Sequence, residues 1–184
     1  MDTREALVAA ALKVLEQDGE AQFSTRTVCT IANVTAPTLY YHFGNADGLL
    51  SAAIAQAFAE FLRSKIAAVN SPDPVTALRE GWDDYVRFAA ARPRLYVAMM
   101  SRFLGGGEIP AARQASDLLL ERVHAIASAG CLAVSVEAAT DHVWAAVNAV
   151  ALLHVTAAQR GAQPPAPDVI DDIRERTMQS ILTL

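Results

Sequence analysis

The chain has 184 residues, of which 53% are hydrophobic and 19% are charged, and its formal net charge is −5 at pH 7. A chain of this length can bury enough surface to fold without a metal, and its two distant cysteines argue against a disulfide framework. The N-terminus lacks the basic and apolar regions of a signal peptide, and the apolar stretch 143–158 is shorter than the ~20 residues that span a bilayer. The composition therefore predicts a cytoplasmic protein without a membrane segment.

The first part of the chain predicts three short helices. In the first, apolar side chains recur with the spacing of one helix face, at Leu7, Ala10, Ala11, Val14 and Leu15. Gly19 can end this helix as a C-cap. Ser24 and Thr35 are suitable N-caps for a second helix at about 25–31 and a third at about 36–42.

Further helices are expected along the rest of the chain. Asn70 to Pro74 is the clearest linker, because Asp73 can cap a helix whose first residue is Pro74. The expected helices lie at about 47–69, 74–92, 95–104, 110–129, 135–161 and 168–182. No stretch alternates with period two for long enough to predict a strand. The expected fold class is therefore all-α with about nine helices, in which three small helices precede a larger bundle.

The second and third predicted helices have the spacing of a helix-turn-helix. About three residues separate them, and Asn33 among these tolerates the left-handed backbone of a sharp turn. A recognition helix meets base edges with its N-terminal residues, where Ala36 and Pro37 are small enough to approach the groove floor. Hydroxyl groups that suit phosphate oxygens lie at Thr25, Thr35, Thr38 and Tyr40. Arg26 is the candidate for a guanine contact.

Residues 4–50 resemble the DNA-binding region of the tetracycline-repressor (TetR) family. The resemblance is carried by REALVAAALKVLEQDG, FSTRTVCTIANVTAPTLYYHF and NADGLL, and its most specific part is APTLYYHF, Ala36 to Phe43. Members of this family are homodimeric regulators, usually repressors, with three DNA-binding helices and a larger helical domain that holds a small-molecule pocket. Carried over by position, the phosphate contacts would be Thr25, Thr38, Tyr41 and His42, and the base-side contacts Arg26, Ala36, Pro37 and Tyr40.

The resemblance implies both an organisation and a function. The expected domains are a helix-turn-helix DNA-binding domain over 1–46, a connecting helix over 47–69, and a ligand-binding and dimerisation domain over 70–184. The expected function is transcriptional repression, relieved when a small, largely apolar ligand releases the dimer from a palindromic DNA operator. The alternative is a helical protein-interaction module that does not bind DNA.

The charge of the N-terminal region is unusual for a DNA-binding protein. Such proteins usually carry a basic surface, whereas residues 1–50 hold Arg4, Lys13 and Arg26 against six acidic side chains, a net charge of −3. The sequence also departs from the family at Ala46, where a lysine is usual, and at Asn33, which replaces a turn glycine. We therefore expect weak non-specific DNA affinity with a shallow salt dependence.

Aromatic and sulfur-containing side chains gather after the linker and predict an apolar ligand pocket. The candidate lining residues are Trp82, Tyr85, Phe88, Tyr96, Met99, Met100, Phe103, Leu119, Val123, Trp144 and Asn148. The alternative for each apolar member is a place in the hydrophobic core.

The predicted helix at 135–161 is apolar on every side, which favours a partner on its outward side. One face, with Val143, Val147, Val150 and His154, is assigned to a dimer interface, and the neighbouring face, with Trp144 and Asn148, to the pocket. The last helix offers Ile170, Ile173, Thr177 and Ile181 as the matching dimer surface. The resemblance adds that family dimers pair these two helices into a four-helix bundle.

Metal and catalytic chemistry find no support in the residue pattern. His142 and His154 are separated by about 18 Å along one helix, too far apart to share a metal. The acidic pairs Asp83-Asp84 and Asp171-Asp172 are expected on solvated faces. The sequence therefore predicts no enzyme activity, no metal site and no cofactor.

Overall fold

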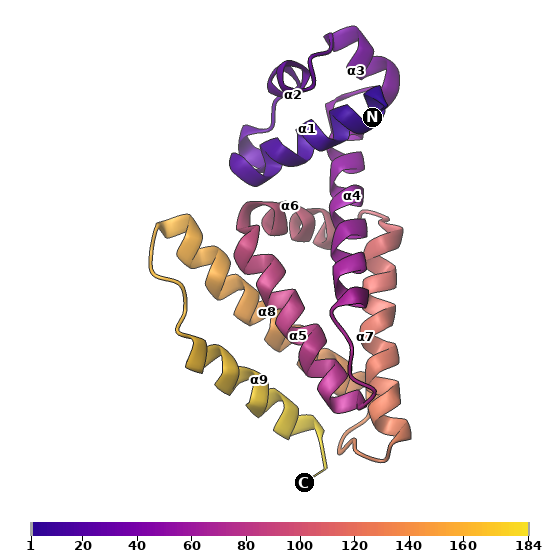
Figure 1. The fold of residues 1–184 in the computed structure, drawn as a ribbon, viewed down its shortest axis with the longest axis vertical. Helices are drawn as coiled ribbons and strands as arrows, with labels where there is room; N and C mark the ends of the chain where they lie inside the picture. The colour runs from indigo at the N-terminus through magenta and orange to yellow at the C-terminus, as the bar shows by residue number, and fades with distance from the viewer. Residues whose placement is uncertain (1, 184) are drawn as a thin grey trace. The chain divides into compact units, whose positions relative to one another are not determined.

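A computed structural model describes residues 2–183 and is helical almost throughout (Figure 1). Within these residues the helices are α1 (Thr3–Gln17), η1 (Glu20–Gln22), α2 (Thr25–Ala32), α3 (Ala36–Phe43), α4 (Ala46–Ala67), α5 (Pro74–Ala91), α6 (Pro93–Leu104), α7 (Pro110–Ser128), α8 (Val136–Arg160) and α9 (Pro167–Ile181). The all-α prediction is confirmed, and the short 3₁₀ turn η1 was not predicted. Over the same residues, no helix is both long and apolar enough to cross a membrane.

The chain divides into two compact units. One comprises the residues up to 61 together with 94–112, and the other comprises 62–93 together with 113 onward. The boundary therefore falls inside α4, and α6 packs with the N-terminal helices. Two hydrogen bonds attach α6 to this unit. Arg94 donates to the carbonyl of Gln17 in α1, and Arg102 donates to Asp47 Oδ1 in α4 at 2.9 Å. The functional division of the chain into three parts stays a prediction.

The first unit is built on the apolar face of α1. Leu7, Ala11 and Leu15 are completely buried there, as are Val28 of α2 and Leu39 of α3. These side chains fix α2 and α3 against α1, in agreement with the element contacts. Burial of each of these leucine and valine side chains is worth roughly 1.5–3 kcal/mol, so the small helices are held by packing and not by helix propensity alone.

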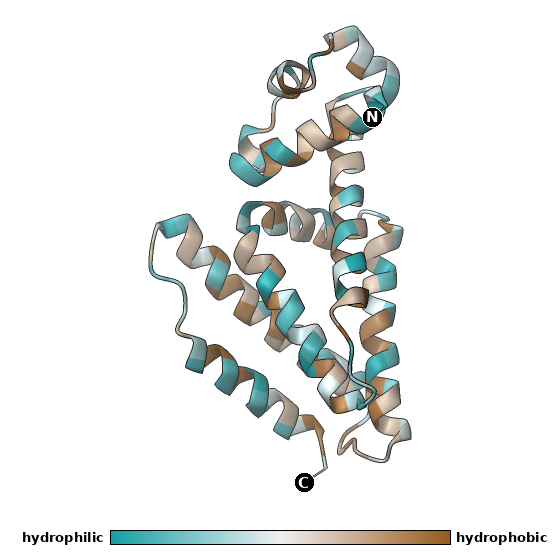
Figure 2. Cartoon of the chain, viewed as in Figure 1, coloured by the Kyte–Doolittle hydropathy of each residue, from teal (hydrophilic) through white to brown (hydrophobic). Residues whose placement is uncertain are grey.

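The second unit has a core drawn from four helices. Its buried members are Leu78, Trp82 and Val86 of α5, Leu119, Val123 and Ile126 of α7, Ala139, Val143, Val147 and Val150 of α8, and Met178 and Ile181 of α9. Polar residues lie along the other sides of α5 and α9 (Figure 2). The end of α9 is fastened to the α7–α8 loop, because Ala133 N donates to Ile181 O and Thr183 N donates to Cys131 O.

Several helix ends follow the predicted caps. As predicted, Asp73 accepts a hydrogen bond from Thr76 N at 2.8 Å. At the start of α4, Asn45 Oδ1 accepts a hydrogen bond from Gly48 N at 2.8 Å. Ser24 and Thr35 occupy N-cap positions without a side-chain cap hydrogen bond. Thr35 instead shares a 2.9 Å hydrogen bond with the Thr38 hydroxyl, which holds both hydroxyls at the start of α3.

Candidate nucleic-acid interface

The turn between α2 and α3 has the geometry that the sequence predicts. Asn33 has φ 53° and ψ 47°, the left-handed conformation, and Val34 N donates to Cys29 O at 3.0 Å. Among L-residues, asparagine adopts this conformation with little cost. The reversal leaves Leu39 completely buried, and it therefore turns the opposite side of α3 outward.

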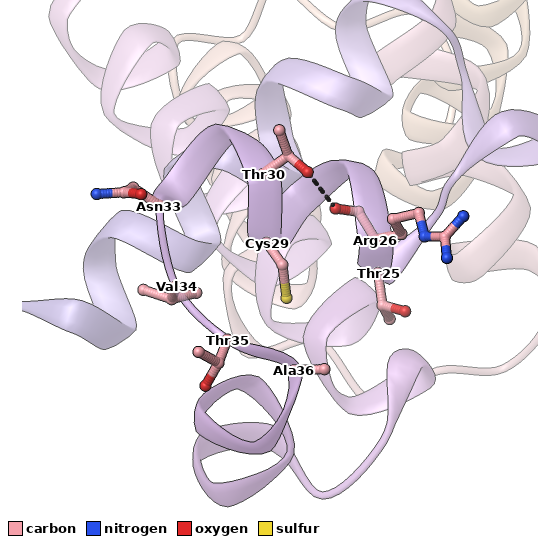
Figure 3. A pocket seen from close by; sticks show the side chains of 8 residues that line it. All are labelled: Thr25, Arg26, Cys29, Thr30, Asn33, Val34, Thr35 and Ala36. Atoms are coloured by element: carbon pink, nitrogen blue, oxygen red, sulfur yellow. Dashed lines mark hydrogen bonds between the residues drawn. The ribbon is translucent and has the colours of Figure 1, made fainter.

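A cavity of about 510 Å³ lies between α2 and the start of α3 (Figure 3). Its lining residues are Thr25, Arg26, Cys29, Thr30, Asn33, Val34, Thr35 and Ala36. Four predicted DNA-contacting residues are therefore brought together: Thr25, Arg26, Thr35 and Ala36. The thiol of Cys29 points into the space between the two helices, and Thr30 Oγ1 bonds back to Arg26 O at 3.0 Å. This hydroxyl is consequently engaged within its own helix.

The remaining candidate residues follow the outward side of α3. Pro37 is exposed, Tyr40 is 46% exposed and Tyr41 is 86% exposed, whereas Thr38 and His42 are half-buried. An exposed tyrosine at 86% has almost no packing role in this chain, which favours a role in binding. The structure places all nine candidates on one helix-turn-helix, and their contact with DNA stays a prediction.

Aromatic side chains form a row at the end of α3. The rings of Tyr41 and His42 lie edge to face with centroids 5.3 Å apart, and His42 lies 6.2 Å from Phe43. The guanidinium carbon of Arg4, from the first turn of α1, lies over the Phe43 ring at 5.3 Å from its centroid. Sequence reasoning did not select Arg4, because the cation is more than thirty positions from α3 along the chain.

The predicted pocket residues are divided between the two units. Tyr96, Met99, Met100 and Phe103 belong to the first unit, and the other seven belong to the second. In the second unit Trp82, Leu119 and Val123 are core members, and Tyr85 packs beside them and donates a 2.8 Å hydrogen bond to Asn148 Oδ1. Trp144 is 40% exposed, on the outward side of α8. The ligand pocket itself stays a prediction.

The predicted dimer face of α8 is inside the protomer. Val143, Val147 and Val150 are at most 5% exposed, and Ile181 of α9 is completely buried. These side chains pack against α5 and α7, so the earlier assignment of this face to a partner is wrong. His154, Ile170, Ile173 and Thr177 are half-buried at the edges of the same core.

The outward face of α8 carries a different set of apolar side chains. Trp144 is 40% exposed, Leu152 58% and Leu153 44%, with Ala145 and Ala149 exposed between them. We call these five residues the outer α8 face. The two faces could not be told apart from the sequence, because both are apolar and only the packing of α5 and α7 decides which is covered.

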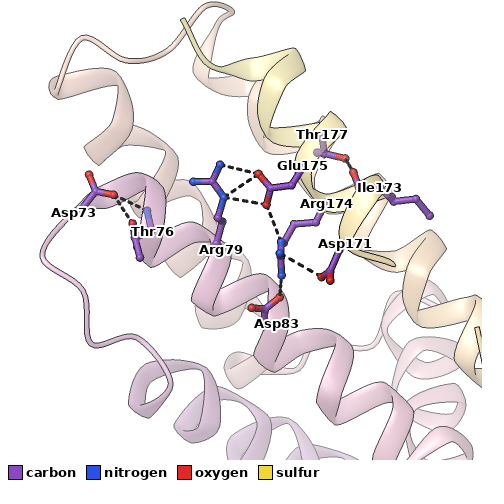
Figure 4. Close-up of polar contacts among 9 residues, drawn as sticks. All are labelled: Asp73, Thr76, Arg79, Asp83, Asp171, Ile173, Arg174, Glu175 and Thr177. Atoms are coloured by element: carbon purple, nitrogen blue, oxygen red, sulfur yellow. Dashed lines mark hydrogen bonds and ion pairs between the residues drawn. The ribbon is translucent and has the colours of Figure 1, made fainter. Parts of the chain in front are cut away.

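Charged side chains join α5 to α9 (Figure 4). Arg79 donates to both carboxylate oxygens of Glu175, and Arg174 pairs with Asp83 and Asp171. The hydrogen bonds from Arg79 lower the pKa of Glu175. Asp83 and Asp171 are exposed, as expected for solvated carboxylates, and they also hold these ion pairs.

A buried charge cluster in the second unit was not predicted. Asp84 is only 3% exposed, although it was expected on a solvated face. Lys65, for which no position was predicted from the sequence, is 6% exposed. Ser64 Oγ donates to Asp84 Oδ1 at 2.9 Å, while Asp84 Oδ2 is buried without a hydrogen-bond partner among the described residues. Burial, reinforced by the charge of Arg122 and opposed by Asp84, lowers the pKa of Lys65 from 10.5 to about 8.

Arg122 connects this cluster to the end of α4. Its guanidinium donates to the Lys65 carbonyl at 2.8 Å, so it satisfies one of the last acceptors of the helix. Gly81 makes room for it, because a Cβ built at Gly81 would lie 2.0 Å from Arg122 Nη1. A glycine inside a helix was thus the sequence signal for this site.

Comparisons with known proteins agree with the helix-turn-helix. Residues 7–53 match the family described as bacterial regulatory proteins, tetR family. The nicotine-responsive transcriptional repressor HdnoR of Paenarthrobacter nicotinovorans is 31% identical over 78 residues, which cover 42% of this chain and 40% of that protein. The transcriptional repressor NicS of Pseudomonas putida is 30% identical over 90 residues, 46% of this chain and 42% of that protein. The matches thus span about two fifths of these relatives.

Solved structures share the fold over the whole chain. A protein of unknown function from Rhodococcus sp. RHA1 superposes with a TM-score of 0.85 at 22% identity, covering 100% of this chain and 97% of that one. A TetR-family transcription regulator from Marinobacter aquaeolei VT8 has a TM-score of 0.75 at 15% identity, with 99% and 96% covered. Residues 7–53 thus match the tetR family of bacterial regulatory proteins, and the solved structures share the fold of the whole chain.

Proposed function

We propose that the chain is a transcriptional repressor that binds a palindromic DNA operator as a homodimer in the cytoplasm. The observation that carries the proposal is the exposed side of α3, where Ala36, Pro37, Tyr40 and Tyr41 stand outward from a turn of the correct geometry. A single short helix covers only a few base pairs. Two helix-turn-helix units about 34–36 Å apart, or near multiples of that distance, read a two-fold symmetric site.

A small, largely apolar effector is proposed to release the repressor from DNA. The support is the set of aromatic side chains of α5 and α8, together with Asn148, which accepts a hydrogen bond from Tyr85, so that both residues offer polar groups. A ligand that favours one conformation shifts DNA affinity by a coupling free energy of about 1–3 kcal/mol. Because one relative is described as nicotine-responsive, nicotine is the first compound to test.

The test of DNA binding is a gel-shift titration with DNA from directly upstream of the chain's own gene. The proposal predicts a specific complex that a scrambled duplex of equal composition does not form. It also predicts a shallow salt dependence, and a log–log slope near −8 or steeper would contradict the expected small number of phosphate contacts. Adding nicotine or other apolar compounds to the complex then tests release.

The exposed apolar residues Trp144, Leu152 and Leu153 favour a second candidate function, a helical protein-interaction module that does not bind DNA. The gel shift separates the two. A folded protein that forms no complex with its upstream DNA at low salt would support the interaction module and overturn the repressor.

Dimerisation is proposed to use the outer α8 face. Replacing Leu152 with glutamate should convert the dimer to a monomer at micromolar concentration, because a carboxylate buried against the partner's apolar face loses its hydration. Sedimentation velocity or light scattering measures the mass.

The matched control is Leu104→Glu, the same chemical change at a leucine that is 70% exposed on α6. This variant should stay dimeric. A wild-type protein that is monomeric at micromolar concentration, or a Leu152→Glu variant that remains dimeric, would contradict the assignment.

A further inference from the structure

We infer that Arg4 is a DNA-backbone contact, positioned by Phe43 beside the recognition helix. This inference rests on the proposed DNA-binding function. Arg4 is exposed in the first turn of α1, and its guanidinium carbon lies 5.3 Å from the centroid of the Phe43 ring. The contact joins α1 to the last residue of α3, so a residue remote in the sequence reaches the DNA-binding face.

The row of rings at the end of α3 relates Arg4 to the candidate phosphate contacts. From Arg4 the contacts continue through Phe43 to His42 and from His42 to Tyr41, whose ring is 86% exposed. His42 and Tyr41 are two of the proposed phosphate contacts. The cation therefore lies at one end of a continuous group of side chains that would follow the DNA backbone.

The geometry leaves the guanidinium able to bind an anion. A guanidinium that stacks on an aromatic face still presents its N–H donors at its edge, and its planar fork matches two phosphate oxygens. The neighbouring carboxylate of Glu5 is engaged elsewhere, because its Oε2 accepts a hydrogen bond from Asp2 N at 3.1 Å. The stacking also limits the freedom of a long side chain, which lowers the entropy cost of binding.

Arg4 is one of few cations among the first fifty residues, so its contribution to DNA binding should be large enough to measure. Only Arg4, Lys13 and Arg26 are basic there, against six acidic side chains. With so few cations, removing one that neutralises a phosphate should change the salt dependence measurably. The ligand group is a backbone phosphate, which is the same in every sequence, so Arg4 would supply affinity without specificity.

The experiment compares Arg4→Gln with the wild-type dimer on two duplexes, the upstream fragment that the wild type binds and a scrambled duplex of equal composition. Fluorescence anisotropy gives Kd at several salt concentrations. Because each protomer of the dimer loses one cation, Arg4→Gln should weaken binding to both duplexes by about 100-fold at low salt, as expected for two lost charge-assisted hydrogen bonds, and should reduce the log–log slope by about 1.8.

Two further variants make the result specific. Lys13→Gln removes an equal charge from an exposed site on the same helix and should leave affinity and slope close to wild type. Arg4→Lys keeps the charge and should restore the slope, although its point charge stacks less well on Phe43. A purely structural role for Arg4 would not move the salt slope.

The outcomes separate the inference from the function on which it rests. If the wild type binds its upstream DNA and Arg4→Gln keeps the wild-type slope, the inference is overturned and the repressor proposal stands. An effect confined to the upstream duplex would also overturn it, since that result would indicate base recognition. If the folded wild type binds neither duplex at low salt, the proposed function itself fails.

Discussion

Replacing Tyr41 with alanine should abolish detectable operator binding, a loss of at least about 100-fold in affinity. The side chain is 86% exposed in the absence of DNA, so its removal takes away little of the folded core. In the proposed complex its hydroxyl donates to a phosphate, and hydrogen bonds to charged groups are worth about 1.5–3 kcal/mol. Its ring also lies edge to face with His42, so the truncation removes one of the two aromatic rings beside His42. Anisotropy with the upstream duplex measures the loss.

Two controls accompany the Tyr41→Ala variant. Tyr41→Phe keeps the ring and removes the hydroxyl, and it should retain intermediate affinity, about tenfold below wild type. Sedimentation and thermal unfolding of Tyr41→Ala should match the wild type, because residue 41 lies outside the core and the outer α8 face. Binding within threefold of wild type would mean that the groove-facing side of α3 has been placed wrongly.

Replacing Asp84 with asparagine should lower the free energy of unfolding by about 3 kcal/mol at pH 7. Asp84 is 3% exposed and its charge opposes the positive charges of Lys65 and Arg122. Removing one member of a buried group of charges leaves the others uncompensated, at a typical cost of 3–5 kcal/mol. Urea unfolding at pH 7 gives the value.

The double variant Asp84→Asn, Lys65→Met provides the control for this charge effect. It should be less destabilised than the sum of its single variants, because the uncompensated ammonium is gone. Strict additivity would show that the two charges do not interact. Asp83→Asn, one residue away and paired with Arg174 near the surface, should cost at most about 1 kcal/mol.

Lys65 also gives the stability a defined pH dependence. Its pKa is about 8 in the folded chain against an ordinary 10.5, so between these values the unfolded state binds more protons than the folded state. The free energy of unfolding should therefore rise with pH from about 8 to 10.5, and the gain from Lys65 should be lost again as the pH falls through about 8. The full contribution is about 3 kcal/mol. Subtracting the curve of Lys65→Met isolates it, and parallel curves would contradict the assignment.

The helix-turn-helix could be predicted from the sequence because its signals are local. Asn33, the N-cap position of Thr35 and the buried Leu39 each act within a few residues, and the structure places all three as the pattern indicates. Arg4 could not be found in this way. Its contact with Phe43 depends on how α1 packs against α3, and a short-range sequence pattern does not predict that packing.

In the second unit, the burial of individual side chains could not be predicted from neighbouring residues in the sequence. Val147 and Leu152 belong to the same helix and are both apolar, yet one is 5% exposed and the other 58%. The difference comes from the position of α5 and α7, which lie elsewhere in the chain. Asp84 was expected in water for the same reason, because charge alone predicts exposure and its partner Ser64 lies twenty positions away.

Because Gly81 contacts Arg122, the effect of a substitution at one of these positions should depend on the residue at the other. Glycine inside a helix is disfavoured by about 1 kcal/mol relative to alanine, so Gly81→Ala ought to stabilise α5. In this chain it should do the reverse, because the new methyl group would meet the guanidinium and displace it from the Lys65 carbonyl. After Arg122→Ala the same change should become stabilising, which chemical denaturation of the four variants would measure. The two substitutions should thus show sign epistasis, so that the order in which they arise decides whether alanine at position 81 stabilises or destabilises the chain.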